Sequence, residues 1–253
     1  MRNKTNQTQE LDWLSAMRKI LDCIEEKRNV RVDVGRIPLD DKKTMDLFKK
    51  GDTEGVFGFG SPDMRKILKQ AKPESFDDLM ALCALYGLEG KFRPAVFQML
   101  PEYIARKTGK TEVDNIHPSL KPILAPTCGM ILYQDQITAI LCKMAGYSPE
   151  DAEVIRYKLA KKHSEQMAKL EPEFFCRCHD RKYSRRVTSR VWELILPYAG
   201  LVGRRDLVSV YTFTAYQFAY LKAHYDPAPR KFAAELRKQL KLREIEGEDE
   251  LPF

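Results

Sequence analysis

Apolar residues recur at helical spacing along most of the chain. Leu11, Leu14, Leu21 and Ile24 predict an amphipathic helix over residues 8–27. The same periodicity, together with helix-start and helix-stop residues, indicates a mainly α fold. Further helices are predicted over residues 41–50, 99–106, 131–145, 149–162, 164–180, 184–198, 209–225 and 229–243.

Local signals refine where these helices begin. Ser61-Pro62 and Ser148-Pro149 each place a good N-cap residue before a proline, which suits the first turn of a helix. Asp40 and Asp41 can cap the helix that precedes Gly51. The alternation over residues 30–34 departs from the helical pattern and predicts a strand or an extended link.

No run of residues approaches the roughly 18–20 apolar positions that a membrane span needs, and the first ten residues are polar. We therefore expect no secretory signal, no membrane partner and a cytoplasmic location. The six cysteines in a chain of 253 residues do not suggest a disulfide scaffold. Cys176, Cys178 and His179 resemble half of a zinc site, but no second pair of ligands is suitably spaced, so free thiols are the better interpretation.

The balance of charge favours a polyanionic partner. The chain carries 43 Lys and Arg against 36 Asp and Glu, a formal charge of +7. Basic residues gather between 181 and 206, and Arg156, Lys158, Lys161 and Lys162 share a predicted helix. They could contact phosphates, or they could form an ordinary solvated face, which composition alone favours. Nearby aromatic side chains could stack on bases, namely Tyr157, Tyr183, Tyr211, Tyr216 and Tyr220, although the spacing of Tyr216 and Tyr220 by four fits core packing equally well.

Longer stretches carry a more specific signal. Residues 37–86, 128–169 and 214–225 resemble, in order, the bacterial DNA polymerase III α subunits of the C family. The resemblance includes Tyr-Gln-Asp-Gln at 133–136 and Ala-Gly-Tyr-Ser at 145–148. It implies a multi-helix fingers domain with a short β or extended element near the N-terminus. The implied domains are a palm remnant over 1–36, the helical fingers over 37–228, and a C-terminal helix with an acidic tail over 229–253.

The resemblance also bears on catalysis. Polymerases of this family hold Mg²⁺ with three palm carboxylates, and Asp12 matches the third of them. The Pro-Asp-x-Asp motif that supplies the other two does not occur in this sequence. One carboxylate cannot hold a pair of metal ions. The family therefore implies nucleotidyl transfer, whereas this chain is expected to be a truncated and diverged copy that holds no cofactor and has no activity by itself.

The resemblance assigns binding residues position by position. The family's paired basic residues match Arg156 and Tyr157, so one basic residue of the two is kept. The family's Gly-Lys-Lys matches residues 160–162, and the segment that matches its Lys-Ser-His contains two further arginines. The resemblance therefore implies phosphate contacts for Arg156, Lys161, Lys162, Arg204 and Arg205. Positions matching the family's Tyr-Gln-Glu-Gln are expected to pack at the template or nucleotide site, namely Tyr133, Gln134 and Gln136.

Three functions remain open from the sequence. The chain can be part of a polymerase that another chain completes, a non-catalytic DNA-binding or polymerase-modulating protein, or a decaying gene product. Expected partners are DNA, as primer-template or single strand, and a complementary polymerase chain. Segments 239–242 and 251–253 faintly resemble peptides that bind sliding clamps, although an amphipathic helix and a frayed end explain them more simply.

Overall fold

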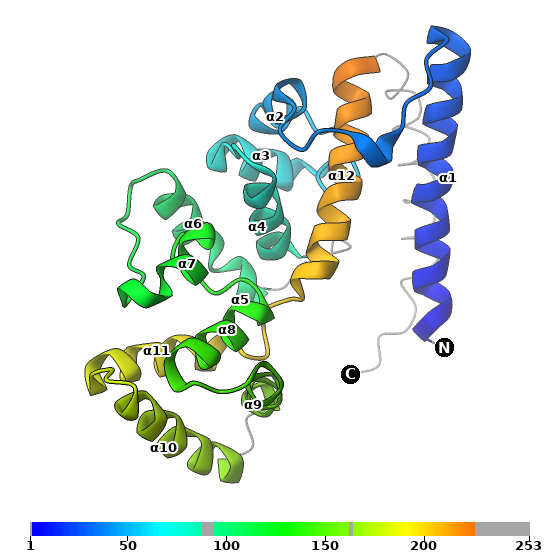
Figure 1. The fold of residues 1–253 in the computed structure, drawn as a ribbon. Coiled ribbons are helices and arrows are strands. Elements are labelled where there is room, and N and C mark those ends of the chain that lie inside the picture. The colour runs from blue at the N-terminus through cyan, green and yellow to red at the C-terminus, as the bar shows by residue number, and fades with distance from the viewer. Residues whose placement is uncertain (1, 88–93, 162–163, 226–253) are drawn as a thin grey trace. The chain divides into compact units, whose positions relative to one another are not determined.

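The computed structural model describes residues 2–87, 94–161 and 164–225, with only the backbone described for 2–12, 94–95 and 164–166. The described chain is mainly helical, as the sequence predicts, and its described residues contain no β-strand (Figure 1). None of the described helices is both long enough and apolar enough to cross a membrane. The predicted helix at 229–243 and the two segments that resemble clamp-binding peptides lie outside the described residues.

The α-helices follow one another in the order shown in Figure 1, joined by short 3-10 turns at Val34–Arg36, Pro118–Leu120 and Ala125–Thr127. The α-helices are α1 (Arg2–Arg28), α2 (Lys42–Lys49), α3 (Pro62–Ala71), α4 (Phe76–Tyr86), α5 (Pro94–Phe97), α6 (Leu100–Lys107), α7 (Lys121–Leu124), α8 (Gln134–Ala145), α9 (Pro149–Lys161), α10 (Ser164–Asp180), α11 (Arg185–Tyr198) and α12 (Arg205–Tyr225).

The chain divides into two compact units. The first unit comprises residues 1–76 and 212–253, and the second unit comprises residues 77–211. The second unit therefore holds α4 apart from its first residue, α5 to α11, and the first turns of α12. The predicted domain boundaries at 36/37 and 228/229 stay predictions.

Local signals place most helix ends correctly. Asp41 and Ser61 cap α2 and α3 through their side chains, and Gly146 ends α8 in the left-handed conformation. Residues 29–33 form a link without regular secondary structure rather than a strand. Pro101 lies in the first turn of α6, where a missing N–H costs no hydrogen bond, so it starts that helix instead of disturbing it.

Aromatic side chains build the core of the first unit. Phe48 of α2 packs edge-on against Phe59 at 5.3 Å and stacks on Tyr216 of α12 at 6.1 Å between ring centroids. The Tyr216 hydroxyl accepts a hydrogen bond from the backbone N–H of Asp41. The Asp41 carboxylate in turn lies 2.9 Å from Nε2 of His224. One capping residue thus ties α2 to the C-terminal part of α12.

Helix α8 lies at the centre of the second unit. Its side chains Ile137, Ile140 and Leu141 are fully buried in a core shared with α9, α10 and α11. Phe174 of α10 stacks on Trp192 of α11 at 5.1 Å between ring centroids. Because α8 contacts both α9 and α10, its position determines where the surface residues of this unit lie.

A buried amide fixes the start of α8. Gln136 is 1 % exposed, and its Oε1 accepts hydrogen bonds from the backbone N–H groups of Leu132 and Tyr133. Its Nε2 donates to the Ile123 carbonyl at 3.0 Å and to Thr127 Oγ1 at 2.7 Å. Unsatisfied polar groups are costly in a core, so these bonds hold the turn before α8 in one conformation.

We expect the link through Asp41 to make the first unit sensitive to acid. Burial alone would raise the pKa of the Asp41 carboxyl, but hydrogen bonds from His224 and Thr44 outweigh it and lower the pKa below its ordinary value. A lowered pKa means that the stabilisation is complete above about pH 5 and is lost as the pH falls below about 4. Asp41→Asn should lower the free energy of unfolding by about 1–2 kcal/mol at pH 7.

Urea unfolding across a pH series measures this effect. The difference between Asp41→Asn and the unmodified chain should shrink towards zero near pH 3. The matched control is Asp40→Asn, because Asp40 is exposed and its replacement changes the net charge equally. A difference at pH 3 as large as that at pH 7 would contradict the account.

Candidate nucleic-acid interface

Arg156 lies on α9 and is largely buried, with 8 % exposure. Its Nε donates to Oε2 of Glu153, one turn earlier, at 2.9 Å, and a second nitrogen bonds the other carboxylate oxygen. The hydrogen bond from Arg156 lowers the pKa of the Glu153 carboxyl. Glu153 also accepts a hydrogen bond from Thr138 of α8 at 3.1 Å. Arg156 is therefore anchored to α8 through a carboxylate.

Arg205 reaches the same part of α8 from the first residue of α12. Its Nε donates to Oδ2 of Asp135 at 2.7 Å, and its guanidinium carbon lies 4.2 Å from the ring centroid of Tyr133. The Arg205 side chain is 39 % exposed and that of Asp135 is 53 % exposed. The cation is thus held in place on two sides while one part of it stays in contact with solvent.

These two arginines converge although they lie 49 positions apart in the sequence. Asp135 and Thr138 are three residues apart, so they lie on one face of the first two turns of α8. Before it reaches Arg205, the chain passes close to α9 again. A Cβ added at Gly200 would lie 3.2 Å from the carbonyl oxygen of Ala160 on α9. We call the set of predicted phosphate-contact residues that the structure describes, Arg156, Lys161, Arg204 and Arg205, the α8 basic face.

The other members of the α8 basic face are more exposed. Arg204 forms an ion pair with Asp206, and the hydrogen bond from Arg204 lowers the pKa of that carboxyl. Lys161 is exposed near the end of α9, and its Nζ lies 5.3 Å from the ring centroid of Tyr157. Lys162, the fifth predicted phosphate contact, lies outside the described residues.

Tyr133, Gln134 and Gln136 have partners within the second unit. Gln134 donates from its backbone N–H to the Gly203 carbonyl at 3.0 Å and from Nε2 to the Val202 carbonyl. Tyr133 is 2 % exposed and forms an isolated parallel bridge with Gly203. These residues hold the chain before α12 against the start of α8, which positions Arg205. Their packing against a template or nucleotide stays a prediction.

Metal ligands do not gather among the described side chains: no three His, Cys, Asp or Glu residues there form a group that could hold an ion. Asp12 lies on α1, but its side chain is not among those described. The described residues therefore do not fit a metal pair, and we derive no catalytic step through one. That the chain holds no cofactor by itself stays a prediction.

The cysteines considered for zinc lie near the end of α10. Cys178 is fully buried, and burial raises the pKa of its thiol to about 11. Cys176 and His179 are exposed on the same helix. The Cys178 thiol is buried, whereas the Cys176 thiol is exposed, so the two do not face one shared site. Both are free thiols.

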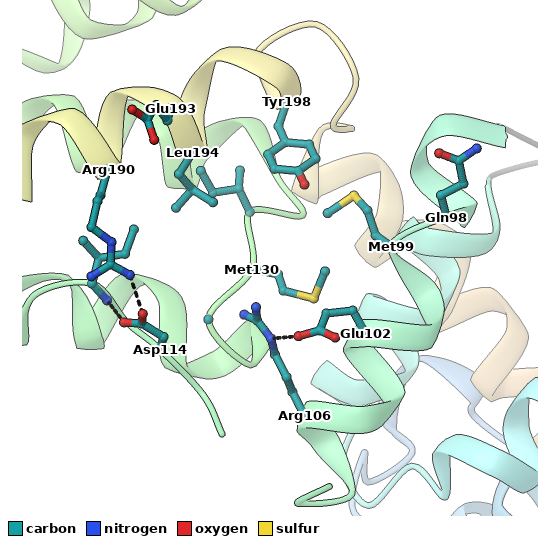
Figure 2. A pocket seen from close by; sticks show the side chains of 13 residues that line it. Gln98, Met99, Glu102, Arg106, Asp114, Met130, Arg190, Glu193, Leu194 and Tyr198 are labelled. Carbon is teal, nitrogen blue, oxygen red and sulfur yellow. Dashed lines mark hydrogen bonds and ion pairs between the residues drawn. The ribbon is translucent and has the colours of Figure 1, made fainter. Parts of the chain in front are cut away.

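A separate cavity of about 560 Å³ lies in the second unit between α6 and α11 (Figure 2). Its charged side chains form two pairs, Arg106 with Glu102 and Arg190 with Asp114. With Glu193 added, carboxylates outnumber guanidinium groups, so the cavity does not favour a polyanion. The remaining wall is mostly apolar and comprises Met99, Ile116, Met130, Ile131, Leu194 and Tyr198, with Gln98 and Gly129.

Comparison with known proteins identifies the chain's relatives. The family model of the bacterial DNA polymerase III alpha subunit finger domain matches residues 13–182. A DNA polymerase III subunit alpha from Halalkalibacterium halodurans is 37 % identical over 223 residues, which is 88 % of this chain and 19 % of that protein. The Bacillus subtilis protein of the same name is 36 % identical over 212 residues, 84 % of this chain and 18 % of that protein.

A third relative, the DNA polymerase III subunit alpha of Borreliella burgdorferi, is 35 % identical over 229 residues, 89 % of this chain and 19 % of that protein. The chain thus spans about a fifth of the length of these relatives. The match begins at residue 13 and includes α8 and α9. It ends before Arg204 and Arg205. The chain belongs to the bacterial DNA polymerase III alpha subunit finger domain family.

Proposed function

We propose that the chain is a nucleic-acid- and nucleotide-binding fingers module of a DNA polymerase III alpha-like replicative polymerase, acting on DNA in the cytoplasm. The observation that carries the proposal is that Arg156, through Glu153, and Arg205 are both held against the first two turns of α8. Guanidinium groups bind phosphate through charge-assisted hydrogen bonds, so the partly exposed Arg205 can contact a phosphate there, while Arg156 fixes α9 beside it. Family membership supports DNA as the source of that phosphate.

Carboxylate partners do not prevent phosphate binding at this face. Ion pairs between exposed side chains contribute little to stability, so a phosphate can replace Asp135 at Arg205 or Asp206 at Arg204 at little cost. Arg156 differs because its side chain is only 9 % exposed. A buried charge that loses its partner is much more costly, so we expect Arg156 to keep Glu153 and to act by holding α9 against the start of α8.

Catalysis is not part of the proposed activity of this chain alone. Of the three family carboxylates, the sequence resemblance assigns only Asp12, and metal-assisted transfer needs a cage of several ligands. A complementary polymerase chain that carries the others is the partner we propose. A DNA-binding or polymerase-modulating role would use the same α8 basic face and would need no such partner.

Loss of the α8 basic face should weaken DNA binding in a salt-dependent way. Replacing Arg156, Lys161, Lys162, Arg204 and Arg205 by alanine should lower affinity for single-stranded and primed DNA. On a single strand, the slope of log affinity against log salt should become shallower by roughly 0.7 for each phosphate that the variant no longer neutralises. Fluorescence anisotropy across a salt series measures both quantities.

A control variant separates this face from the overall charge. Lys42, Lys43, Lys50, Lys66 and Lys69 are exposed on or beside α2 and α3, and replacing them by alanine removes the same charge. Thermal melting should show that both variants stay folded. Equal losses of DNA affinity in the two variants, or affinity that does not respond to salt, would contradict the proposal.

Primer extension tests the absence of independent catalysis. The purified chain with Mg²⁺, a primed template and deoxynucleotides should yield no extended product, because one matching carboxylate cannot position two metal ions. Adding a chain that carries the Pro-Asp-x-Asp motif serves as the positive arm. Extension by this chain alone would contradict the proposal.

A further inference from the structure

Tyr157 stands out on the exposed side of α9. Its side chain is 55 % exposed, whereas Tyr103 and Tyr133, also in the second unit, are nearly or fully buried. The Tyr183 hydroxyl lies 3.1 Å from Ser119 Oγ, and its ring packs edge-on against His117. Tyr157 is therefore more accessible to a molecule approaching from solvent than these other tyrosines of the second unit.

The surroundings of Tyr157 are positively charged. Lys161 lies one turn further along α9, with its Nζ 5.3 Å from the ring centroid, and Lys158 is the next residue in the chain. Arg156 precedes the tyrosine and is held by Glu153. An aromatic ring beside lysines matches the chemistry of a single nucleic-acid strand, in which bases alternate with phosphates.

We propose that Tyr157 is a stacking platform for an unpaired base of single-stranded DNA, with Lys161 and Lys158 contacting the adjoining phosphates. This inference rests on the proposed function, because it assigns to the α8 basic face the kind of nucleic acid that it prefers. Bases in a duplex are stacked on their neighbours and do not offer a face to the ring, so the platform favours a single strand. The contact is tolerant of sequence, since every base has a π-face.

Tyr157 also distinguishes this chain from the pattern of its family. The sequence resemblance places a second basic residue at this position, where this chain has an aromatic one. The substitution exchanges a phosphate contact for a base contact. Val154, one turn earlier on α9, is 52 % exposed and extends the apolar surface beside the ring.

Abasic DNA separates base stacking from phosphate binding. The probes are a short oligothymidine strand and a strand of equal length whose internal nucleotides lack bases but keep their phosphates. The full chain should bind oligothymidine about 5- to 150-fold more tightly than the abasic strand in fluorescence anisotropy. Tyr157→Ala should abolish that preference, and Tyr157→Phe should keep it, because the ring rather than the hydroxyl makes the contact.

Further variants define what the ring contributes. Lys161→Ala should weaken binding to both strands by similar factors, because both carry phosphates. Tyr157→Arg should raise affinity for the abasic strand while it removes the preference for bases. Val210→Ala is the matched control, since Val210 is an apolar side chain of the second unit with 60 % exposure, and it should leave the preference unchanged.

Two outcomes would overturn the inference alone. One is equal binding of the two strands by the unmodified chain, and the other is a preference for bases that persists in Tyr157→Ala. Failure to bind either strand would overturn both the inference and the proposed function.

Discussion

The buried amide of Gln136 is the interaction on which the second unit depends. It bonds Leu132 and Tyr133 on one side and Ile123 and Thr127 on the other, so it fixes a turn that has no regular secondary structure of its own. A side chain that satisfies several buried backbone groups cannot be replaced without leaving some of them unsatisfied. The position of the first turn of α8 is consequently fixed, and it determines the positions of the helices that pack against α8.

The arginines of the α8 basic face are held in ion pairs, and a phosphate could replace the carboxylate in the exposed ones. Arg205 and Arg204 each have a carboxylate partner in a solvent-exposed position, whereas Arg156 is paired in a nearly buried one. The exposed pairs keep the guanidinium groups ordered, which lowers the entropy that a ligand must remove on binding. The cavity between α6 and α11 has the opposite character, because its arginines face an excess of carboxylates. Two clusters of arginine in one unit thus differ in what they can bind.

Sequence patterns predict the parts of this fold that depend on near neighbours. Caps at Asp41 and Ser61 are confirmed because capping involves residues three positions apart. The buried face of α1 is predicted only in part: Ile24 is buried as expected, but Leu14 is 50 % exposed, and Met17 and Ile20 are buried in addition. A helix with apolar residues on several sides leaves that choice to packing.

The candidate site shows the same limit. Resemblance to the family selects the arginines of the α8 basic face, and the spacing of Glu153 and Arg156 is a local signal for their pair. The contact between Arg205 and Asp135 joins positions 70 residues apart, so no local pattern indicates it. The exposure of Tyr157, likewise, depends on which side of α9 packs against α8, and only the structure separates it from the buried tyrosines.

The dependence of the α8 basic face on the Gln136 amide is tested most directly by Gln136→Leu. We expect the free energy of unfolding to fall by about 2–6 kcal/mol, because two backbone N–H groups lose their acceptor. We also expect DNA affinity to fall under conditions in which the variant stays folded. Thr53→Val is the comparison, since its buried hydroxyl bonds the Phe59 carbonyl in the first unit. It should lower stability without lowering DNA affinity. A folded Gln136→Leu variant that binds DNA as tightly as the unmodified chain would contradict the account.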